Sequence, residues 1–360
     1  MNRGWLVLPT TAALLLALGM SACAKKDSGG AAAGGKTIAL LLPESKTTRY
    51  EAFDRPLFEA KVKSLCADCK VLYFNADQDA AKQQQQVEAA LTQGADVLVL
   101  DAVDAAAVAP LVNQAKQKKV PVVAYDRLIS GIGYEYYVSF NNVRVGEMQG
   151  QALLDALNAK GTTAKGKVVM INGAPTDPSS ADYKKGAHSV LDGKVTIGRE
   201  FDTPDWSPDK AQQQMEQAIT ALGRDNIVGV LSANDGMASG AIAAMKRAGF
   251  ATMPPITGQD AELAAVQRIL TGEQYMTIYL DIRTEAEKSA ELAVALSRNE
   301  HPGAPTTVDN GTEKIPSFLL DPIAVTADKI KDTIVKDGFY KASDICTADV
   351  AAACAKVGIQ

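Results

Sequence analysis

The chain has 360 residues, with 42 acidic and 37 basic side chains and a formal net charge of −5. This acidic balance argues against a nucleic acid partner, because proteins that bind nucleic acid usually carry a basic face. The length allows two domains with separate buried cores.

The first 22 residues are typical of a secretory signal peptide, since Arg3 precedes an apolar run that ends in small residues. The tetrapeptide Met20-Ser21-Ala22-Cys23 resembles a bacterial lipobox, in which the cysteine is acylated and begins the mature chain. An ordinary secretion signal with a chance cysteine is the alternative. Residues 23–36 then form a flexible Gly/Ala/Ser-rich linker. We therefore expect an extracytoplasmic protein that meets the membrane only through a lipid on Cys23.

Four cysteines remain after Cys23, an even number that suits disulfides in an exported chain. The local pairs Cys66–Cys69 and Cys346–Cys354 are favoured, because each pair lies within one short segment. Four cysteines allow three connectivities, so the pairing stays open. A single CxxC and only two histidines do not make a zinc site.

From residue 37 onward, short apolar runs alternate with longer amphipathic runs. The continuous apolar character of the short runs predicts strands covered on both faces of a sheet. The predicted strands are 37–43, 70–75, 96–101, 120–126, 167–172, 227–235 and 255–260, and 137–142 reads as a strand that leads out of the first half.

The amphipathic runs between these strands predict helices over 79–93, 104–118, 144–159, 208–222, 236–248 and 284–298. Strands that alternate with helices predict mostly parallel, doubly wound sheets. There are too many strands for one domain of ordinary size, so we expect two such sheets.

Polar side chains gather immediately beyond the carboxyl ends of the predicted strands. In open α/β sheets this edge faces the ligand crevice. Two halves that face each other across such crevices would enclose a small polar ligand. The strand-end residues are Asp101, Asp126, Arg127, Asn172, Asn234, Asp235, Gln259 and Asp260.

Motifs for catalysis or cofactor binding are not found. The segment 161–167 resembles a phosphate loop but precedes a strand instead of following one, and there is no GxSxG elbow. Two histidines, His188 and His301, leave little general base chemistry. We expect no catalytic residue, no cofactor and no metal.

Part of the strand-end polar set suits a sugar, because carboxylates accept and guanidinium or amide groups donate hydrogen bonds to ring hydroxyls. The polar candidates are Asp126, Arg127, Asn234, Asp260 and Arg49. Aromatic rings stack on the apolar face of a sugar ring. Tyr50 and Trp206 are the candidate stacking rings. Trp206 lies in the polar loop 202–209, where its alternative role is a partly buried surface anchor.

Several segments together resemble xylose-type periplasmic sugar-binding proteins of ABC transporters, over nearly all of residues 37–345. They are Arg49-Tyr50 with Asp54-Arg55, AYDRLI (124–129), YVSFNNVRVGEMQGQAL (137–153), SANDG (232–236), GQDAEL (258–263), MTIY (276–279) and IKDTIVKDGFYK (330–341).

The resemblance implies a type I periplasmic binding protein fold, in which two doubly wound Rossmann-like α/β lobes are joined by a three-stranded hinge. We expect the N-terminal lobe over 37–140 and 283–313, and the C-terminal lobe over 141–282 and 314–360. The sugar contacts that the resemblance implies, together with the more loosely placed Asp177, are Arg49, Tyr50, Asp126, Arg127, Asp177, Trp206, Asn234 and Asp260.

Two departures from the family pattern bear on which sugar is bound. Leu280 stands where relatives carry a sugar-contacting Lys, and losing a charged donor should cost about 1.5–3 kcal/mol. Pro178 and Ser179 stand where relatives commonly have Asn-Asn. These changes keep the sugar class but put xylose itself in doubt.

We therefore expect a monomeric lipoprotein that closes its two lobes on one monosaccharide and presents it to ABC permease subunits. A sugar-responsive repressor is disfavoured, because such proteins carry an N-terminal helix-turn-helix and this chain has a signal and a linker there. A secreted sugar hydrolase with paired carboxylates such as Asp126 and Asp260, and a sugar sensor coupled to a membrane receptor, are the alternatives.

Overall fold

The computed structural model describes residues 35–359. The predicted signal peptide, the lipidation candidate Cys23 and nearly all of the linker lie outside these residues. None of the helices within the described range combines the length and the apolar character that a membrane span requires.

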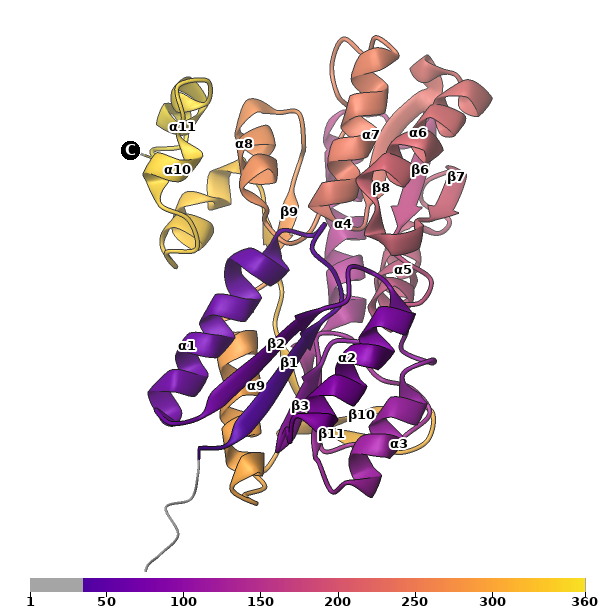
Figure 1. Ribbon diagram of the computed structural model, residues 1–360. Helices are drawn as coiled ribbons and strands as arrows, with labels where there is room; N and C mark the ends of the chain where they lie inside the picture. The colour runs from indigo at the N-terminus through magenta and orange to yellow at the C-terminus, as the bar shows by residue number, and fades with distance from the viewer. Residues whose placement is uncertain (1–34, 360) are drawn as a thin grey trace, which may run out of the picture. The chain divides into compact units, whose positions relative to one another are not determined.

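The first half is built on a seven-stranded sheet with the order β10-β11-β5-β4-β3-β1-β2 (Figure 1). All neighbours in this sheet are parallel except the β10–β11 pair. The strands are β1 (Thr37–Leu42), β2 (Lys70–Asn75), β3 (Val97–Leu100), β4 (Val122–Tyr125), β5 (Tyr136–Phe140), β10 (Thr306–Asp309) and β11 (Lys314–Leu320).

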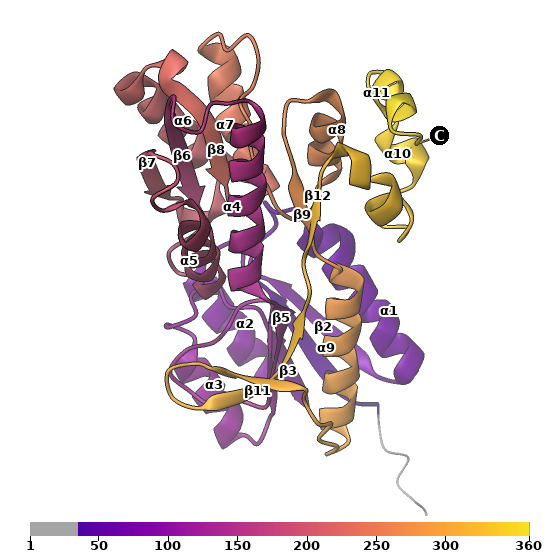
Figure 2. The same cartoon turned by 180° about the vertical axis from the view of Figure 1, so that it is seen from behind.

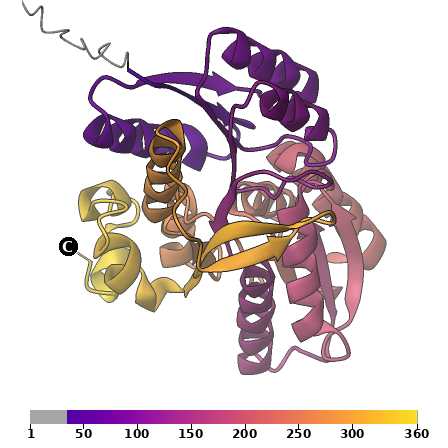
Figure 3. The ribbon, with the colours of Figure 1, turned by 90° about the horizontal axis from the view of Figure 1, so that it is seen from below.

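Helices cover both faces of this sheet (Figures 1 and 3). On one face, Leu40 and Val99 pack against α1 (Arg55–Leu65) and α9 (Ile282–Ser297). On the other face, Leu41 and Leu98 pack against α2 (Ala80–Thr92) and α3 (Ala109–Gln117). Successive strand side chains point to opposite faces, so a sheet buried on both sides needs an unbroken apolar run.

The second half holds a parallel three-stranded sheet of the order β7-β6-β8. An antiparallel pair, β9 with β12, lies in the same half. The strands are β6 (Lys167–Asn172), β7 (Ile197–Asp202), β8 (Ile227–Ser232), β9 (Thr277–Tyr279) and β12 (Ile323–Val325).

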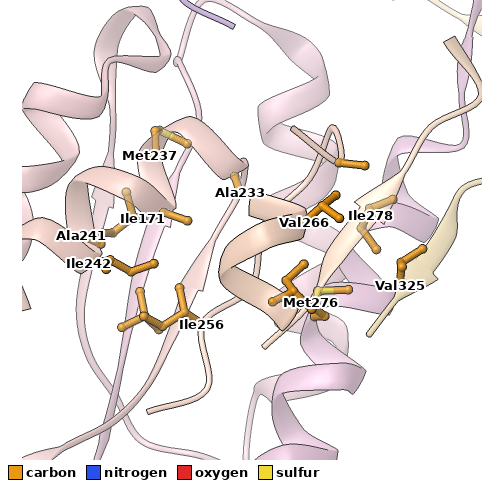
Figure 4. Packing of buried hydrophobic residues seen from close by; sticks show 14 of the residues in the cluster. Ile171, Ala233, Met237, Ala241, Ile242, Ile256, Val266, Met276, Ile278 and Val325 are labelled. Carbon is orange, nitrogen blue, oxygen red and sulfur yellow. The ribbon is translucent and has the colours of Figure 1, made fainter. Parts of the chain in front are cut away.

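Two helix pairs sandwich the three-stranded sheet. Met170 and Leu231 pack with α4 (Asn142–Ala159) and α5 (Pro178–Leu191) on one face. Val169 and Val230 pack with α6 (Pro208–Leu222) and α7 (Asp235–Arg247) on the other. Figure 4 shows this second core continuing from α7 through Ile256 to α8 (Leu263–Thr271) and the β9–β12 pair. The helices and sheets thus form two separately cored α/β lobes of the expected doubly wound kind.

The chain crosses between the two halves three times. It passes from β5 to α4, from β9 to α9, and from β11 to β12; Figure 2 shows the last of these. The predicted boundary at residues 313–314 is wrong, because Ser317–Leu320 of β11 pair with Tyr137–Phe140 of β5 in the first sheet. The third crossing therefore falls after Leu320, and 314–320 belong with the N-terminal half.

The last segment predicted as a strand, 255–260, is wrong as a regular strand. It makes one isolated parallel bridge, between Ile256 and Val230, and occupies the place of a fourth strand beside β8. Pro255 has no N–H to donate, which prevents a regular ladder from starting earlier.

The chain ends in a compact segment of short helices, 326–359, which we call the C-terminal segment. It includes α10 (Ala342–Ile345) and α11 (Ala351–Lys356) and lies beside α8 in Figures 1 and 2. A disulfide joins Cys346 to Cys354 within it. A second disulfide joins Cys66 to Cys69 at the end of α1. These are the two local pairs that the sequence favours.

The contact between α4 and α5 depends on glycines. A Cβ atom at Gly146 of α4 would lie 1.9 Å from the backbone oxygen of Tyr183 on α5, and a Cβ at Gly186 would lie 2.1 Å from the oxygen of Val143. Both of these atoms belong to the backbone, so neither can move unless its helix shifts. The two helices can approach this closely only because glycine has no side chain.

We predict that Gly146→Ala lowers the free energy of unfolding by about 1–3 kcal/mol, because it forces two packed helices apart. Gly236→Ala is the matched control, since its Cβ would meet nothing closer than 3.7 Å, and it should keep or gain up to about 1 kcal/mol through helix propensity. Urea unfolding of both variants measures the difference, and equal midpoints would contradict this packing account.

Candidate functional site

One buried cleft gathers side chains from both halves of the molecule. The space among them is about 20 Å³, enough for one or two water molecules. All eight predicted ligand contacts line it. Of the other four lining residues, Gln259 was expected at the strand-end edge, whereas Thr47, Ser179 and Tyr183 were not expected in the cleft. The lining residues are Thr47, Arg49, Tyr50, Asp126, Arg127, Asp177, Ser179, Tyr183, Trp206, Asn234, Gln259 and Asp260.

Arg49 is the most heavily paired cation of the N-terminal wall. It grips Asp54 with two hydrogen bonds, from Nε at 3.0 Å and from Nη2 at 2.7 Å. Its Nη2 also donates to Glu285 at 2.5 Å, and Nη1 reaches Asp126 at 3.4 Å. Most donors of this guanidinium are therefore used within the protein, with the shortest hydrogen bonds to Asp54 and Glu285 and a longer one to Asp126 in the wall.

Tyr50 is buried in the core of the N-terminal half and lines the cleft, where its hydroxyl bonds to polar side chains. That hydroxyl donates to Asp126 Oδ2 at 3.0 Å and accepts from Arg127 Nη2 at 3.4 Å. The Arg49 guanidinium lies 5.3 Å from the Tyr50 ring centre. Tyr50 thus links the two arginines of the wall through its oxygen and its ring.

Arg127 joins the two halves electrostatically. Its Nε lies 3.0 Å from Asp177 Oδ2 in the C-terminal half and 3.4 Å from Asp101 Oδ1 at the end of β3. Its Nη1 donates to the carbonyl oxygen of Ala102 at 3.1 Å. All three charged side chains are almost fully buried, so removing one partner would leave an uncompensated charge.

The C-terminal wall is built at the start of α5. Asp177 is the N-cap of this helix and accepts a hydrogen bond from the Ser179 N–H at 2.9 Å. Its other oxygen accepts from Trp206 Nε1 at 3.2 Å. Tyr183 lies one helical turn after Ser179, on the same helix face, and meets the Trp206 ring edge to face at 6.3 Å.

The rest of this wall comes from the end of β8 and from the neighbouring segment that ends at Asp260. Asn234 caps α7 through its side-chain oxygen, which accepts from the Met237 N–H at 2.9 Å. Buried Gln149 of α4 donates to the carbonyl oxygens of Ala233 and Gly258, both at 3.0 Å. One amide thus holds the segments that carry Asn234 and Gln259 at a fixed spacing.

Three lining residues have left-handed backbone conformations. The φ angles are +58° at Asp126, +52° at Trp206 and +89° at Asp260. Such angles are uncommon for residues other than glycine and are a true outlier for a bulky side chain. At Asp126 the hydroxyls of Ser139 and Tyr137 donate to its carbonyl oxygen and hold the turn.

Three carboxyl groups in or beside the cleft, those of Asp101, Asp177 and Asp260, are hard to ionise because they are buried. Burial raises the pKa of Asp101 well above its usual range, although Arg127 opposes this, and both carboxyl oxygens of Asp101 lack a hydrogen-bond partner. Burial also raises the pKa of Asp177, again opposed by Arg127. Burial raises the pKa of Asp260 to about 7, against the pull of Arg49.

Several sequence expectations are corrected here. Trp206 is not the partly buried surface anchor of the alternative reading: it lines the cleft, is 5% exposed and packs in the C-terminal core with its ring against Gly173. Leu280 is also buried in that core and does not line the cleft. Of the strand-end residues, Asp101, Asn172 and Asp235 lie outside the lining.

Asp260→Asn should change how stability depends on pH. The folded carboxyl, with a pKa of about 7, binds a proton that the unfolded one, near 3.9, releases. Wild-type stability is therefore lost as pH rises from about 4 to 7, by up to about 4 kcal/mol, and the Asn variant lacks this loss. Unfolding at several pH values, without added ligand, measures the difference, and parallel pH profiles for both proteins would refute the shift.

The chain matches the periplasmic binding protein domain family over residues 38–301. It is 36% identical to a D-xylose-binding periplasmic protein of Escherichia coli over 313 residues, which is 86% of this chain and 92% of that protein. It is 31% identical to a multiple sugar-binding periplasmic protein of Azospirillum brasilense, over 92% of this chain and 97% of the relative.

Solved structures agree with these matches. A solute-binding protein of an ABC transporter from Clostridium phytofermentans, with bound β-D-glucose, is similar with a TM-score of 0.80 and 28% identity, over 86% of this chain and all of that chain. One from Chloroflexus aurantiacus, in complex with D-glucose, gives a TM-score of 0.77 and 27% identity, over 86% of this chain and 98% of that chain. The chain belongs to the periplasmic binding protein family and has its type I fold.

Proposed function

We propose that this protein binds a monosaccharide between its two halves and delivers it to an ABC importer. The observation that carries the proposal is the cleft itself, which brings carboxylate, guanidinium, amide and aromatic groups from both halves into one buried space. Sugar hydroxyls both donate and accept, so they suit this mixed set of partners. The sugar-binding relatives and the glucose-bound structures support the same conclusion.

The binding step is a hinged closure. A space of about 20 Å³ is far smaller than a sugar ring, so the walls must separate to admit one. We propose that the N-terminal lobe comprises 37–140 and 283–320, and that the C-terminal lobe comprises 141–282 and 321–360. The two lobes rotate about the three crossings. A sugar that touches both walls shifts the population toward the closed form, which permease subunits then recognise.

The candidate contacts are the eight cleft residues that the family resemblance implies. Asp126 and Asp260 are proposed as the acceptors that grip hydroxyls from opposite walls, with Asn234 as a donor and Trp206 or Tyr50 beside the ring. Leu280 contributes no donor to the cleft, which favours a sugar other than xylose, or a pentose bound with fewer contacts. The relatives are named as binding proteins, which favours a binder over the hydrolase alternative.

A thermal-shift screen of pentoses and hexoses should identify the ligand, because a sugar at a hundredfold excess over its Kd adds about 2.7 kcal/mol of stability. We then expect Asp126→Asn and Asp260→Asn each to weaken binding about ten- to a hundredfold in calorimetry. Asn is used because it tolerates the left-handed backbone of both positions.

The control is Asp209→Ala, an exposed acid on α6 outside the cleft, which should leave the Kd unchanged. Unaltered affinity in both cleft variants would show that the cleft is wrongly assigned. Release of nitrophenol from aryl glycosides would favour the hydrolase instead.

We also propose that Cys23 is acylated and anchors the protein outside the cytoplasm. In the native host, Cys23→Ser should move the protein from the membrane fraction to the soluble fraction and abolish its labelling by radioactive palmitate. A variant that stays with the membrane and keeps the label would contradict the anchor.

A further inference from the structure

The C-terminal segment, 326–359, reaches beyond its own half of the molecule. Seven of its side chains are buried in the core that it shares with α8 and β9, so the segment is firmly part of the C-terminal half. Gln267 of α8 also donates to the carbonyl oxygen of Ile345 at 3.1 Å, and the Cys346–Cys354 disulfide closes its end. The seven residues are Ile330, Ile334, Phe339, Ile345, Val350, Cys354 and Ile359.

One aromatic ring of the N-terminal half packs against this segment. Phe53 stacks on Phe339 with ring centres 4.2 Å apart and an interplanar angle of 15°. Tyr340 meets Phe53 edge to face at 5.6 Å, and Tyr279 of β9 meets Phe339 at 5.2 Å. We call these four residues, Phe53, Tyr279, Phe339 and Tyr340, the aromatic clasp.

Phe53 belongs to the short helix Tyr50–Asp54, which also carries cleft machinery. Tyr50 of this helix is buried in the N-terminal core, whereas Phe53 packs against the C-terminal core. Asp54, at its end, accepts both hydrogen bonds that orient Arg49. The helix therefore spans the two cores, and whatever fixes Phe53 also fixes Tyr50 and Asp54.

From this geometry we propose that Phe339 and Tyr340 are positioning residues for ligand binding. They hold the Tyr50–Asp54 helix in its cleft-forming place and favour the closed arrangement of the halves. The polar contacts across the cleft, such as Arg127 with Asp177, exchange partners when a ligand enters. The clasp lies outside the cleft lining, so a bound sugar does not displace it, and it can bias closure with or without ligand.

The thermodynamic consequence is a change in apparent affinity without loss of a ligand contact. The apparent Kd equals the intrinsic Kd divided by the fraction of closed, competent protein. Removing the stack lowers that fraction and speeds ligand release. The expected loss of affinity is about two- to tenfold, the range that corresponds to an aromatic pair.

A double-mutant cycle tests the clasp, using full-length mature protein with Phe53→Ala, Phe339→Ala and both changes together. Each single variant should raise the dissociation rate of the sugar found in the screen, and the double variant should match the worse single variant instead of multiplying the two losses. Phe339→Leu keeps apolar bulk without the ring and should fall between wild type and Phe339→Ala. Phe250→Ala, a half-buried ring packed on the same core but away from the N-terminal half, is the matched control.

Small-angle X-ray scattering of the same proteins without sugar supplies a second readout. The clasp proposal rests on the proposed function, and this readout tests the two separately. A wild-type protein that binds no sugar refutes the sugar-binding function, while the scattering still tests the clasp. A larger radius of gyration in the Phe53 and Phe339 variants, but not in Phe250→Ala, is the expected result. Unchanged radii and dissociation rates, or losses that multiply in the double variant, overturn the proposal.

Discussion

The cleft depends on the ion pairs made by one buried group, the guanidinium of Arg127. It is paired with Asp101 from its own half and with Asp177 from the opposite half. A charge this deeply buried is stable only while its partners stay in reach. The two halves therefore meet at a point where their separation has an electrostatic cost, and a ligand that enters must replace the contacts it disturbs.

The residues around Arg127 are held in fixed positions by the backbone and by helix packing. Asp126 and Asp260 sit on left-handed turns that direct their side chains into the cleft, and Asp177 is held by the first turn of α5. The close approach of α4 and α5 at Gly146 and Gly186 fixes how α5 packs against α4. Backbone packing beneath the cleft thus supports the geometry of the polar groups that line it.

Contacts between the two halves include polar pairs in the cleft, such as Arg127 with Asp177, and the apolar stacking of the aromatic clasp. Inside the cleft they are polar, and hydroxyls of a ligand can substitute for them. At the aromatic clasp they are apolar and separate from the ligand. A protein that must both hold and release its ligand needs a ratio of closed to open forms that is neither too high nor too low. A contact that does not involve the ligand is one way to set this ratio.

Much of the fold could be predicted from the sequence, because a strand that is buried on both faces of its sheet is a continuous run of apolar residues. β1, β3 and β4 are continuous apolar runs, and polar residues follow β3 at Asp101 and β4 at Asp126 and Arg127. β7 was missed because its side chains are only partly buried at the sheet edge, and β9 and β12 are three residues each. Short or half-exposed strands carry too little periodicity to be seen.

The cleft was predictable where a residue follows a strand and less so where it lies on a helix. Tyr183 was missed because α5 was not predicted, although Asp177 followed by Pro178 is a usual helix start and would have placed Ser179 and Tyr183 on one face. The burial of Trp206 depends on a left-handed backbone turn, and the polar residues next to it in the sequence do not predict that turn. The contact between Phe53 and Phe339 joins distant parts of the chain, so no local pattern could reveal it.

Hydrogen–deuterium exchange with and without the identified sugar tests the central claim most directly, namely that one ligand is held by both halves. The account predicts slower exchange at once in segments around 46–55 and 124–130 of the first half and around 174–183, 232–237 and 257–262 of the second. Protection confined to one half, or centred away from these segments, would contradict it.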